Sequence, residues 1–118
     1  MTKTKAVTIY GIKNCDTMKK ARAALDKRGV AYDFHDYKTK VIERGKLEGW
    51  ARKTGWERLL NRAGTTFRKL PDAAKTNLDQ RKAIKLMLEQ PSMIKRPVLE
   101  RGKSLLVGFD PERYSGLL

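Results

Sequence analysis

The sequence predicts a single α/β domain whose elements follow the order strand–helix–strand, several helices, and then strand–strand–helix. Two observations carry this prediction. Near the N-terminus, a β-prone run stops at a glycine, and a helical pattern and a second alternating run follow it. Near the C-terminus, two short apolar runs flank a tight turn, which indicates a β-hairpin. The length of 118 residues suits one domain with a modest core, with boundaries at 1–118.

The first strand is predicted over residues 6–10, and Gly11 ends it. A helix follows from about Asp16 to Arg28, because apolar side chains recur there at helical spacing and Gly29 terminates the pattern. Residues 30–37 alternate in polarity, which predicts a second strand. A strand–helix–strand unit of this length places its two strands in parallel, joined by a right-handed crossover.

The middle of the chain is predicted to be a helical insertion over residues 39–92. Helices are expected over residues 43–54, 56–60 and 79–90, with a further short turn of helix opening at 70–72. Residues 61–68 break the helical periodicity with polar and turn-forming side chains. Pro91 ends the last of these helices, because the residue before a proline is driven out of helical geometry.

The last stretch returns to strands and closes with a helix. Residues 97–100 and 104–108 are the two predicted strands, and residues 101–103 form the tight turn between them. Asp110 is a favourable N-cap residue, and Pro111 follows it at the first helical position. A short C-terminal helix is therefore expected.

The composition favours anionic partners and disfavours several classes of protein. The chain has 27 Lys and Arg against 13 Asp and Glu, a net charge of +14 that attracts polyanions or anionic small molecules. The basic residues are spread along the chain, without a recognisable nucleic-acid-binding motif. The absence of a long apolar run predicts no membrane span. A single cysteine cannot form an internal disulfide, which fits the reducing cytoplasm.

That cysteine, Cys15, lies where the first predicted strand gives way to the first predicted helix. The unpaired N–H groups at a helix N-terminus stabilise a thiolate relative to a thiol. Nearby basic side chains add positive charge: Lys13, Lys19, Lys20 and Arg22. The alternative is a small buried side chain without reactivity, as most cysteines are. The polar neighbours Asn14 and Asp16 favour the reactive interpretation.

The residues around Cys15 restrict the reaction. A Cys-x-x-Cys redox motif needs a second cysteine where the chain has Met18, and a phosphatase loop needs an arginine where it has Ala21. His35 is a conceivable partner of the cysteine, although a half-exposed strand histidine is the more ordinary interpretation. One cysteine and one histidine are too few to bind a metal. A monothiol can still attack a disulfide, and an external thiol such as anionic glutathione then resolves the mixed disulfide.

Three segments carry a resemblance to a known family. Residues 11–21 (GIKNCDTMKKA), 61–68 (NRAGTTFR) and 93–98 (MIKRPV) resemble the arsenate-reductase-like (ArsC/Spx) family, and specifically its YffB branch. The similarity extends over about residues 6–116. It implies a thioredoxin-like fold with a mixed four-stranded sheet and a helical insertion. It also implies that Pro97 is a cis-proline and that Arg96 faces the cysteine.

The resemblance assigns roles to individual residues. In the arsenate reductases of this family the cysteine attacks arsenate, glutathione resolves the adduct, and three arginines hold the oxyanion. By this resemblance Cys15 is the catalytic nucleophile. The expected residues for binding substrate or glutathione are Lys13, Asn14, Arg62, Arg96 and Pro97. Arg96 and Arg62 match two of the family's arginines, whereas Val107 occupies the position of the third.

The resemblance to the YffB branch implies a glutathione-dependent monothiol reductase without a bound cofactor, for which glutathione is a co-substrate. One alternative is a non-enzymatic, Spx-like regulator that binds RNA polymerase or nucleic acid. However, Spx regulators carry Cys-x-x-Cys, and this chain has Met18 at the second position. An arsenate reductase is disfavoured by Val107. We expect a monomer whose partner is glutathione or another anionic small molecule, without metal or membrane.

Overall fold

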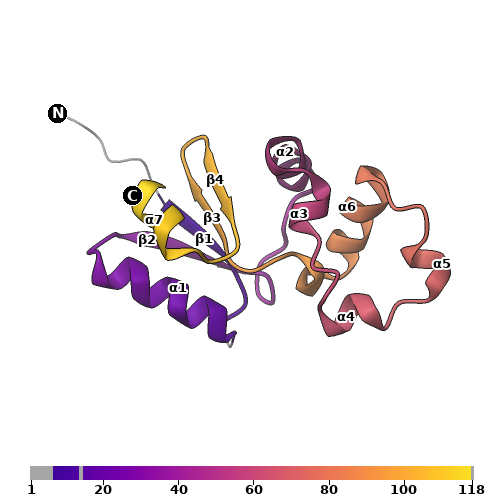
Figure 1. Cartoon of the computed structure of the whole chain (residues 1–118), viewed down its shortest axis with the longest axis horizontal. Helices are drawn as coiled ribbons and strands as arrows, with labels where there is room; N and C mark the ends of the chain where they lie inside the picture. The colour runs from indigo at the N-terminus through magenta and orange to yellow at the C-terminus, as the bar shows by residue number, and fades with distance from the viewer. Residues whose placement is uncertain (1–6, 14, 118) are drawn as a thin grey trace. The chain divides into compact units, whose positions relative to one another are not determined.

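The computed structural model describes residues 7–13 and 15–117 (Figure 1). The chain divides into two compact units. The first comprises the segments before Lys40 and after Lys95, and the second is Lys40–Lys95. The second unit is close in extent to the predicted insertion over 39–92, while the assignment of a single domain over 1–118 stays a prediction.

The first unit contains a mixed four-stranded sheet. Its elements are β1 (Val7–Gly11), α1 (Asp16–Lys27), β2 (Tyr32–Asp36), β3 (Val98–Arg101), β4 (Ser104–Val107) and α7 (Pro111–Leu117). The strand order is β2-β1-β3-β4. The pair β1–β2 is parallel, and the pairs β1–β3 and β3–β4 are antiparallel. The predicted thioredoxin-like βαβ and ββα arrangement is thus confirmed.

One face of this sheet packs against α1 and α7. In register across the strands, Ile9 of β1 aligns with Phe34 of β2 and with Leu99 of β3. Ile9 and Leu99 belong to a buried cluster that α1 and α7 complete with Met18, Ala21, Leu25 and Tyr114, and the partly buried Phe34 packs against it. The helical spacing of the α1 residues explains why this helix buries one side, as the apolar pattern predicts.

The other face of the sheet has a more polar character. Because side chains alternate along a strand, the neighbouring row across the sheet consists of His35, Tyr10, Val98 and Val107. The rings of Tyr10 and His35 lie 5.0 Å apart between centroids. The Tyr10 hydroxyl donates a hydrogen bond of 2.9 Å to a carboxylate oxygen of Glu100. His35 and Val107 therefore belong to the face opposite α1.

The second unit is built from short helices. They are α2 (Arg44–Thr54), α3 (Trp56–Leu59), α4 (Thr65–Arg68), α5 (Asp72–Lys75), α6 (Gln80–Glu89) and the 3-10 turn η1 (Pro91–Met93). Buried side chains on α2, α3, α4 and α6 include Leu47, Trp50, Leu59, Phe67, Ile84 and Met87. The Lys95 N–H donates to the Leu59 carbonyl at 2.8 Å, which ties the end of this unit to α3. Within the described part of the chain, no helix is long and apolar enough to cross a membrane.

Three predicted boundaries need correction. The prediction places no helix in residues 61–68, but α4 forms there around the buried Phe67, in a segment too short to show helical periodicity. The second strand begins at Tyr32 instead of residue 30, since the chain from α1 first makes a turn at Gly29 with positive φ. The third strand begins at Val98, because the proline before it has no N–H group to donate to a ladder.

Candidate active site

Cys15 is the N-cap residue of α1. Its backbone is extended, with φ −106° and ψ 130°, and its carbonyl accepts the helical hydrogen bond from the Lys19 N–H at 2.9 Å. Strand β1 ends at Gly11, so the connection to the helix is short and presents Cys15 at the first turn. The side chain is half-buried against the cluster beneath α1. The sequence-based placement of this thiol at a strand–helix junction is therefore correct.

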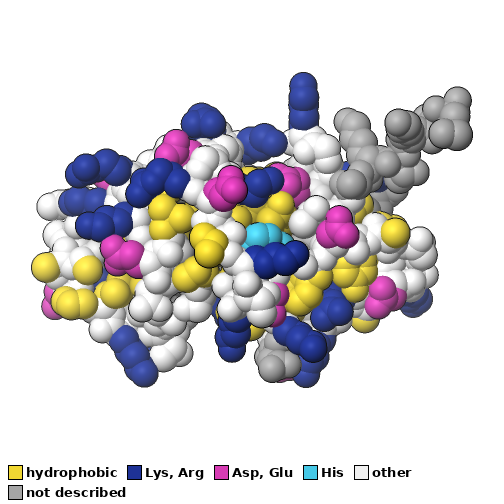
Figure 2. All heavy atoms as spheres, turned by 180° about the vertical axis from the view of Figure 1, so that it is seen from behind, with side chains coloured by type: hydrophobic (Ala, Val, Ile, Leu, Met, Phe, Trp, Pro, Cys, Tyr) yellow, Lys and Arg dark blue, Asp and Glu magenta, His cyan; other side chains and the backbone are white. Residues whose placement is uncertain are grey.

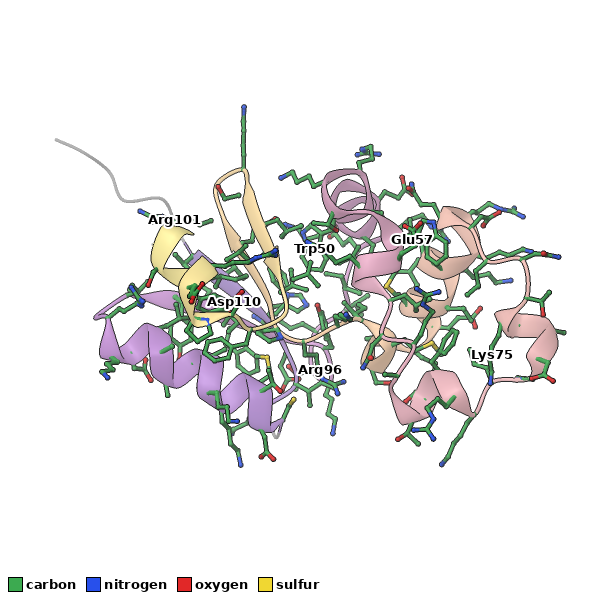
Figure 3. All side chains as sticks on the ribbon, viewed as in Figure 1. Trp50, Glu57, Lys75, Arg96, Arg101 and Asp110 are labelled. Carbon is green, nitrogen blue, oxygen red and sulfur yellow. The ribbon has the colours of Figure 1, made fainter. Side chains whose placement is uncertain are left out.

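The second part of the site is the turn that enters β3. The peptide bond between Arg96 and Pro97 is cis, as the family resemblance implies. The Pro97 carbonyl accepts a hydrogen bond of 2.8 Å from the Gly108 N–H, which fixes the turn to the end of β4. Pro97 is buried and Arg96 is half-buried. Arg96, labelled in Figure 3, thus comes from a firmly held backbone in the same unit as Cys15.

Local electrostatics favour the thiolate form of Cys15. Burial opposes ionisation and taken alone would raise its pKa. The backbone N–H groups of Met18 and Thr17, and then the guanidinium of Arg96, outweigh burial and lower the pKa of Cys15 below its ordinary value. These N–H groups belong to the first turn of α1, where they stabilise negative charge on the sulfur. A lowered pKa is the condition for a reactive cysteine at neutral pH.

Met18 stands where a Cys-x-x-Cys motif would place its second thiol, and it is a core residue. Its side chain has no exposed surface and belongs to the cluster beneath α1. It also covers Gly11, at which an added Cβ atom would overlap the Met18 Sδ atom. The close approach explains the glycine at the end of β1. Cys15 therefore has no second thiol within the chain.

The other residues predicted to bind substrate or glutathione come from separate parts of the chain. Lys13 is exposed in the turn before Cys15, and Asn14 lies outside the described residues. Arg62 belongs to the second unit, where it is exposed in the turn between α3 and α4. Thus the first unit brings together Cys15, Arg96 and Pro97, with Lys13 two positions before the cysteine.

Two further residues bear on the chemistry. His35 contacts Tyr10 and Tyr37 on the sheet face opposite α1, whereas Cys15 packs toward the α1 face. This arrangement favours the interpretation of His35 as a strand histidine. Val107 is half-buried and pairs with Val98; it is the apolar residue that the family resemblance matches to the third arginine. Among the described residues, no three His, Cys, Asp or Glu side chains gather to hold a metal ion.

Sequence reasoning missed Tyr37. Its N–H donates to the Gly11 carbonyl at 2.9 Å, which places it beside the end of β1. Burial, followed by the neighbouring Tyr10, raises the pKa of Tyr37 above its usual value, and the charge of Arg96 acts in the opposite direction. The predicted parallel pairing places Tyr37 at the same sheet edge as Gly11, but its burial and its relation to Arg96 follow only from the fold.

Comparison with known proteins finds similarity over nearly the whole chain. The model of the ArsC family matches residues 10–117. The solved structure of a YffB protein has 61% identity and a TM-score of 0.92, covering 94% of this chain and 97% of that chain. An arsenate reductase (ArsC) related protein from Brucella melitensis has 54% identity and a TM-score of 0.78, covering 98% of this chain and 97% of that chain.

Two curated relatives extend the comparison. An uncharacterized protein of Haemophilus influenzae is 36% identical over 108 residues, covering 92% of this chain and 95% of that protein. The global transcriptional regulator Spx of Streptococcus mutans is 27% identical over 114 residues, covering 95% of this chain and 82% of the regulator. The similarity therefore includes proteins named as regulators as well as proteins named for a reductase.

Proposed function

The chain belongs to the ArsC family, and we propose that it is a monothiol oxidoreductase that uses Cys15 as its nucleophile and glutathione as its electron donor. The observation that carries this proposal is the pairing of Cys15, at the N-terminus of α1, with Arg96 in one unit. The buried Met18 occupies the position at which a second, resolving cysteine would lie. The resolving thiol in this proposal therefore comes from outside the chain.

The proposed reaction has two thiol–disulfide exchange steps. In the first, the Cys15 thiolate attacks the glutathione sulfur of a mixed disulfide between glutathione and a substrate thiol. A bond forms between Cys15 Sγ and that sulfur, the substrate disulfide breaks, and the substrate leaves as a thiolate that takes a proton from water. In the second, a glutathione thiolate attacks the Cys15 adduct, which yields oxidised glutathione and the free Cys15 thiolate. The net change is that the substrate is reduced and glutathione is oxidised.

Charge supports glutathione as the co-substrate. Glutathione carries two carboxylates, and a guanidinium is well suited to bind a carboxylate with paired hydrogen bonds. Arg96 supplies this group beside Cys15, and Lys13 adds a cation in the preceding turn. We extend the binding role to Asn14, Arg62 and Pro97 from the family resemblance. The abundance of glutathione in the cytoplasm favours that compartment.

Mixed-disulfide formation provides the test. The protein is incubated with oxidised glutathione, and its intact mass is measured by mass spectrometry before and after addition of reduced glutathione. The wild type should gain one glutathionyl group and lose it again, whereas Cys15→Ser should gain none. A wild-type protein that stays unmodified under conditions that glutathionylate a small-molecule thiol would refute the proposal.

A second candidate is a regulator that binds RNA polymerase or nucleic acid. The similarity to Spx of Streptococcus mutans and the net charge of +14 favour it. Figure 2 shows Lys and Arg side chains spread over the visible face with Asp and Glu among them, which does not single out one basic patch. The discriminating measurement is a pull-down of RNA polymerase or a salt-dependent DNA-binding assay. Binding that Cys15→Ser leaves unchanged would favour the regulator.

A further inference from the structure

We propose that the outer edge of β4, with the groove between it and α7, binds an extended acidic segment of a partner protein as an added strand. The segment pairs its backbone with β4 and places a carboxylate beside Arg113. This surface shares no residue with the Cys15–Arg96 site, so the inference goes beyond the proposed function. Four features carry it: an unprotected strand edge, outward backbone groups, an open groove, and a complementary charge.

The first feature is the apolar edge of the sheet. In the strand order β2-β1-β3-β4, β2 and β4 form the two edges of the described sheet (Figure 1). Strand β2 carries the acidic Asp33 and Asp36, whereas β4 contains neither a charged residue nor a proline and pairs with β3 in unbroken register. Charges, prolines and bulges are the devices that keep an edge strand from pairing with another chain. Strand β4 is therefore the edge suited to accept a strand.

The second feature is the direction of the β4 backbone groups. The Gly108 N–H, directly after β4, donates to the carbonyl of Pro97, directly before β3, so it points inward toward β3. Backbone groups alternate in direction along a strand, so the N–H and C=O groups of Val107 and Leu105 point outward. Two donors and two acceptors on alternate residues are the pattern with which an incoming strand pairs.

The third feature is an open groove of about 500 Å³ beside this edge. Its lining comes from one strand and one helix: Ser104, Leu105 and Leu106 of β4, and Arg113 and Gly116 of α7. Leu106 packs against the buried cluster beneath α1, which holds the apolar part of the groove in place. The groove thus combines apolar side chains with a cation, and its volume is within the range of ligand-binding clefts.

Gly116 keeps one wall of the groove open. It lies within α7, where glycine is less favourable than alanine. A Cβ atom added at Gly116 would meet no atom of the described residues within 4 Å beyond its own turn of helix, so packing inside the protein does not require glycine there. Arg113 and Gly116 are three residues apart and therefore share one side of α7. The missing side chain allows another chain to approach closely beside the Arg113 guanidinium.

The fourth feature is charge, which favours an acidic segment over a second copy of this chain. The side chain of Arg113 is 53% exposed, and its ion pair with the 50% exposed Asp110 is 3.8 Å long, so a partner's carboxylate can replace this contact with a closer one. A second copy that paired through β4 would bring another Arg113 to the same edge, and each chain carries a net charge of +14. Both charges oppose self-association and attract acidic side chains.

The experiment measures binding of a fluorescent peptide, Glu-Val-Glu-Val-Glu-Val, by anisotropy. A peptide of equal charge with proline in place of valine cannot form a strand and should bind about tenfold more weakly. Gly116→Leu fills the groove and should abolish binding. Gly45→Leu adds the same side chain to an exposed glycine of α2 and should match the wild type. Arg113→Gln should weaken binding about tenfold through loss of a charged hydrogen bond. Circular dichroism verifies that the variants are folded.

Three results would overturn the inference. One is a wild type that binds neither peptide, or both equally. Another is folded Gly116→Leu that binds the valine peptide as tightly as the wild type, because the peptide would then lie elsewhere. The third is a wild-type dimer in analytical ultracentrifugation that Gly116→Leu dissociates, which would assign the edge to a second copy. Failure of the proposed function is read separately, from the absence of a glutathionyl adduct on Cys15.

Discussion

Replacement of Met18 by cysteine tests why this chain depends on an external thiol. Met18→Cys creates a Cys-x-x-Cys motif at the N-terminus of α1. Residues three apart on a helix have Cβ atoms about 5–6 Å apart, and a disulfide needs roughly 3.5–4.5 Å, so closure requires only a small shift at the N-cap. Because Cys15 has extended backbone geometry, its position can adjust without disruption of the helix.

The energetic terms of this substitution are opposite in sign and similar in size. Met18 is fully buried, and its truncation to cysteine loses part of the 2–5 kcal/mol typical of Met→Ala, or about 2 kcal/mol. A disulfide that closes the loop of residues 15–18 restores about 2 kcal/mol through the entropy of the unfolded chain. The reduced variant should therefore be less stable than the wild type, and the oxidised variant nearly as stable.

The assay is the fate of the glutathionyl adduct. In the wild type the adduct on Cys15 persists until reduced glutathione is added. In Met18→Cys the new thiol attacks that adduct within the molecule, so the protein should release glutathione spontaneously and become an internal disulfide. Met87→Cys, which replaces a buried methionine of the second unit, is the control and should keep its adduct. A persistent adduct in folded Met18→Cys would refute the view that Met18 alone prevents internal resolution.

Three further predictions address the same site. Arg96→Met should move the pH midpoint for alkylation of Cys15 upward, because Arg96 helps to lower the pKa of that thiol; alkylation at pH 7 should therefore slow, and an unchanged pH profile would contradict this role. Gly11→Ala should lower the free energy of unfolding in urea by about 1–3 kcal/mol, through overlap with Met18; unchanged stability would mean that the site relaxes freely. Val107→Arg should introduce arsenate-dependent oxidation of glutathione, and an inactive, folded variant would show that a third arginine is insufficient.

The sequence allows the architecture to be predicted because its signals are local and strong. Gly11 and the polar residues after it mark the junction that holds Cys15, and the alternating apolar runs around Gly102 mark the hairpin. The α2 helix forms despite Gly45 and Gly49, because Leu47 and Trp50 bury one side of it. Packing there outweighs the low helix propensity of glycine.

Other features do not follow from local sequence. The cis peptide at Pro97 was indicated only by resemblance, because most X–Pro bonds are trans. The four-residue α4 is too short to show periodicity. In the sequence, Tyr37 is the last residue of a predicted alternating strand. Its hydrogen bond to Gly11 and the effect of Arg96 on its pKa arise only when β1 and β2 pair in parallel. Such contacts between distant residues require the fold.

The central claim is that Cys15 is held as a thiolate by the N-terminus of α1 and by Arg96. Because it is the only cysteine in the chain, the ultraviolet absorbance of its thiolate can be titrated without interference from another thiol. The proposal predicts a midpoint below about 8.5, the ordinary pKa of a cysteine thiol, with no corresponding transition in Cys15→Ser. A midpoint at or above that value would contradict it.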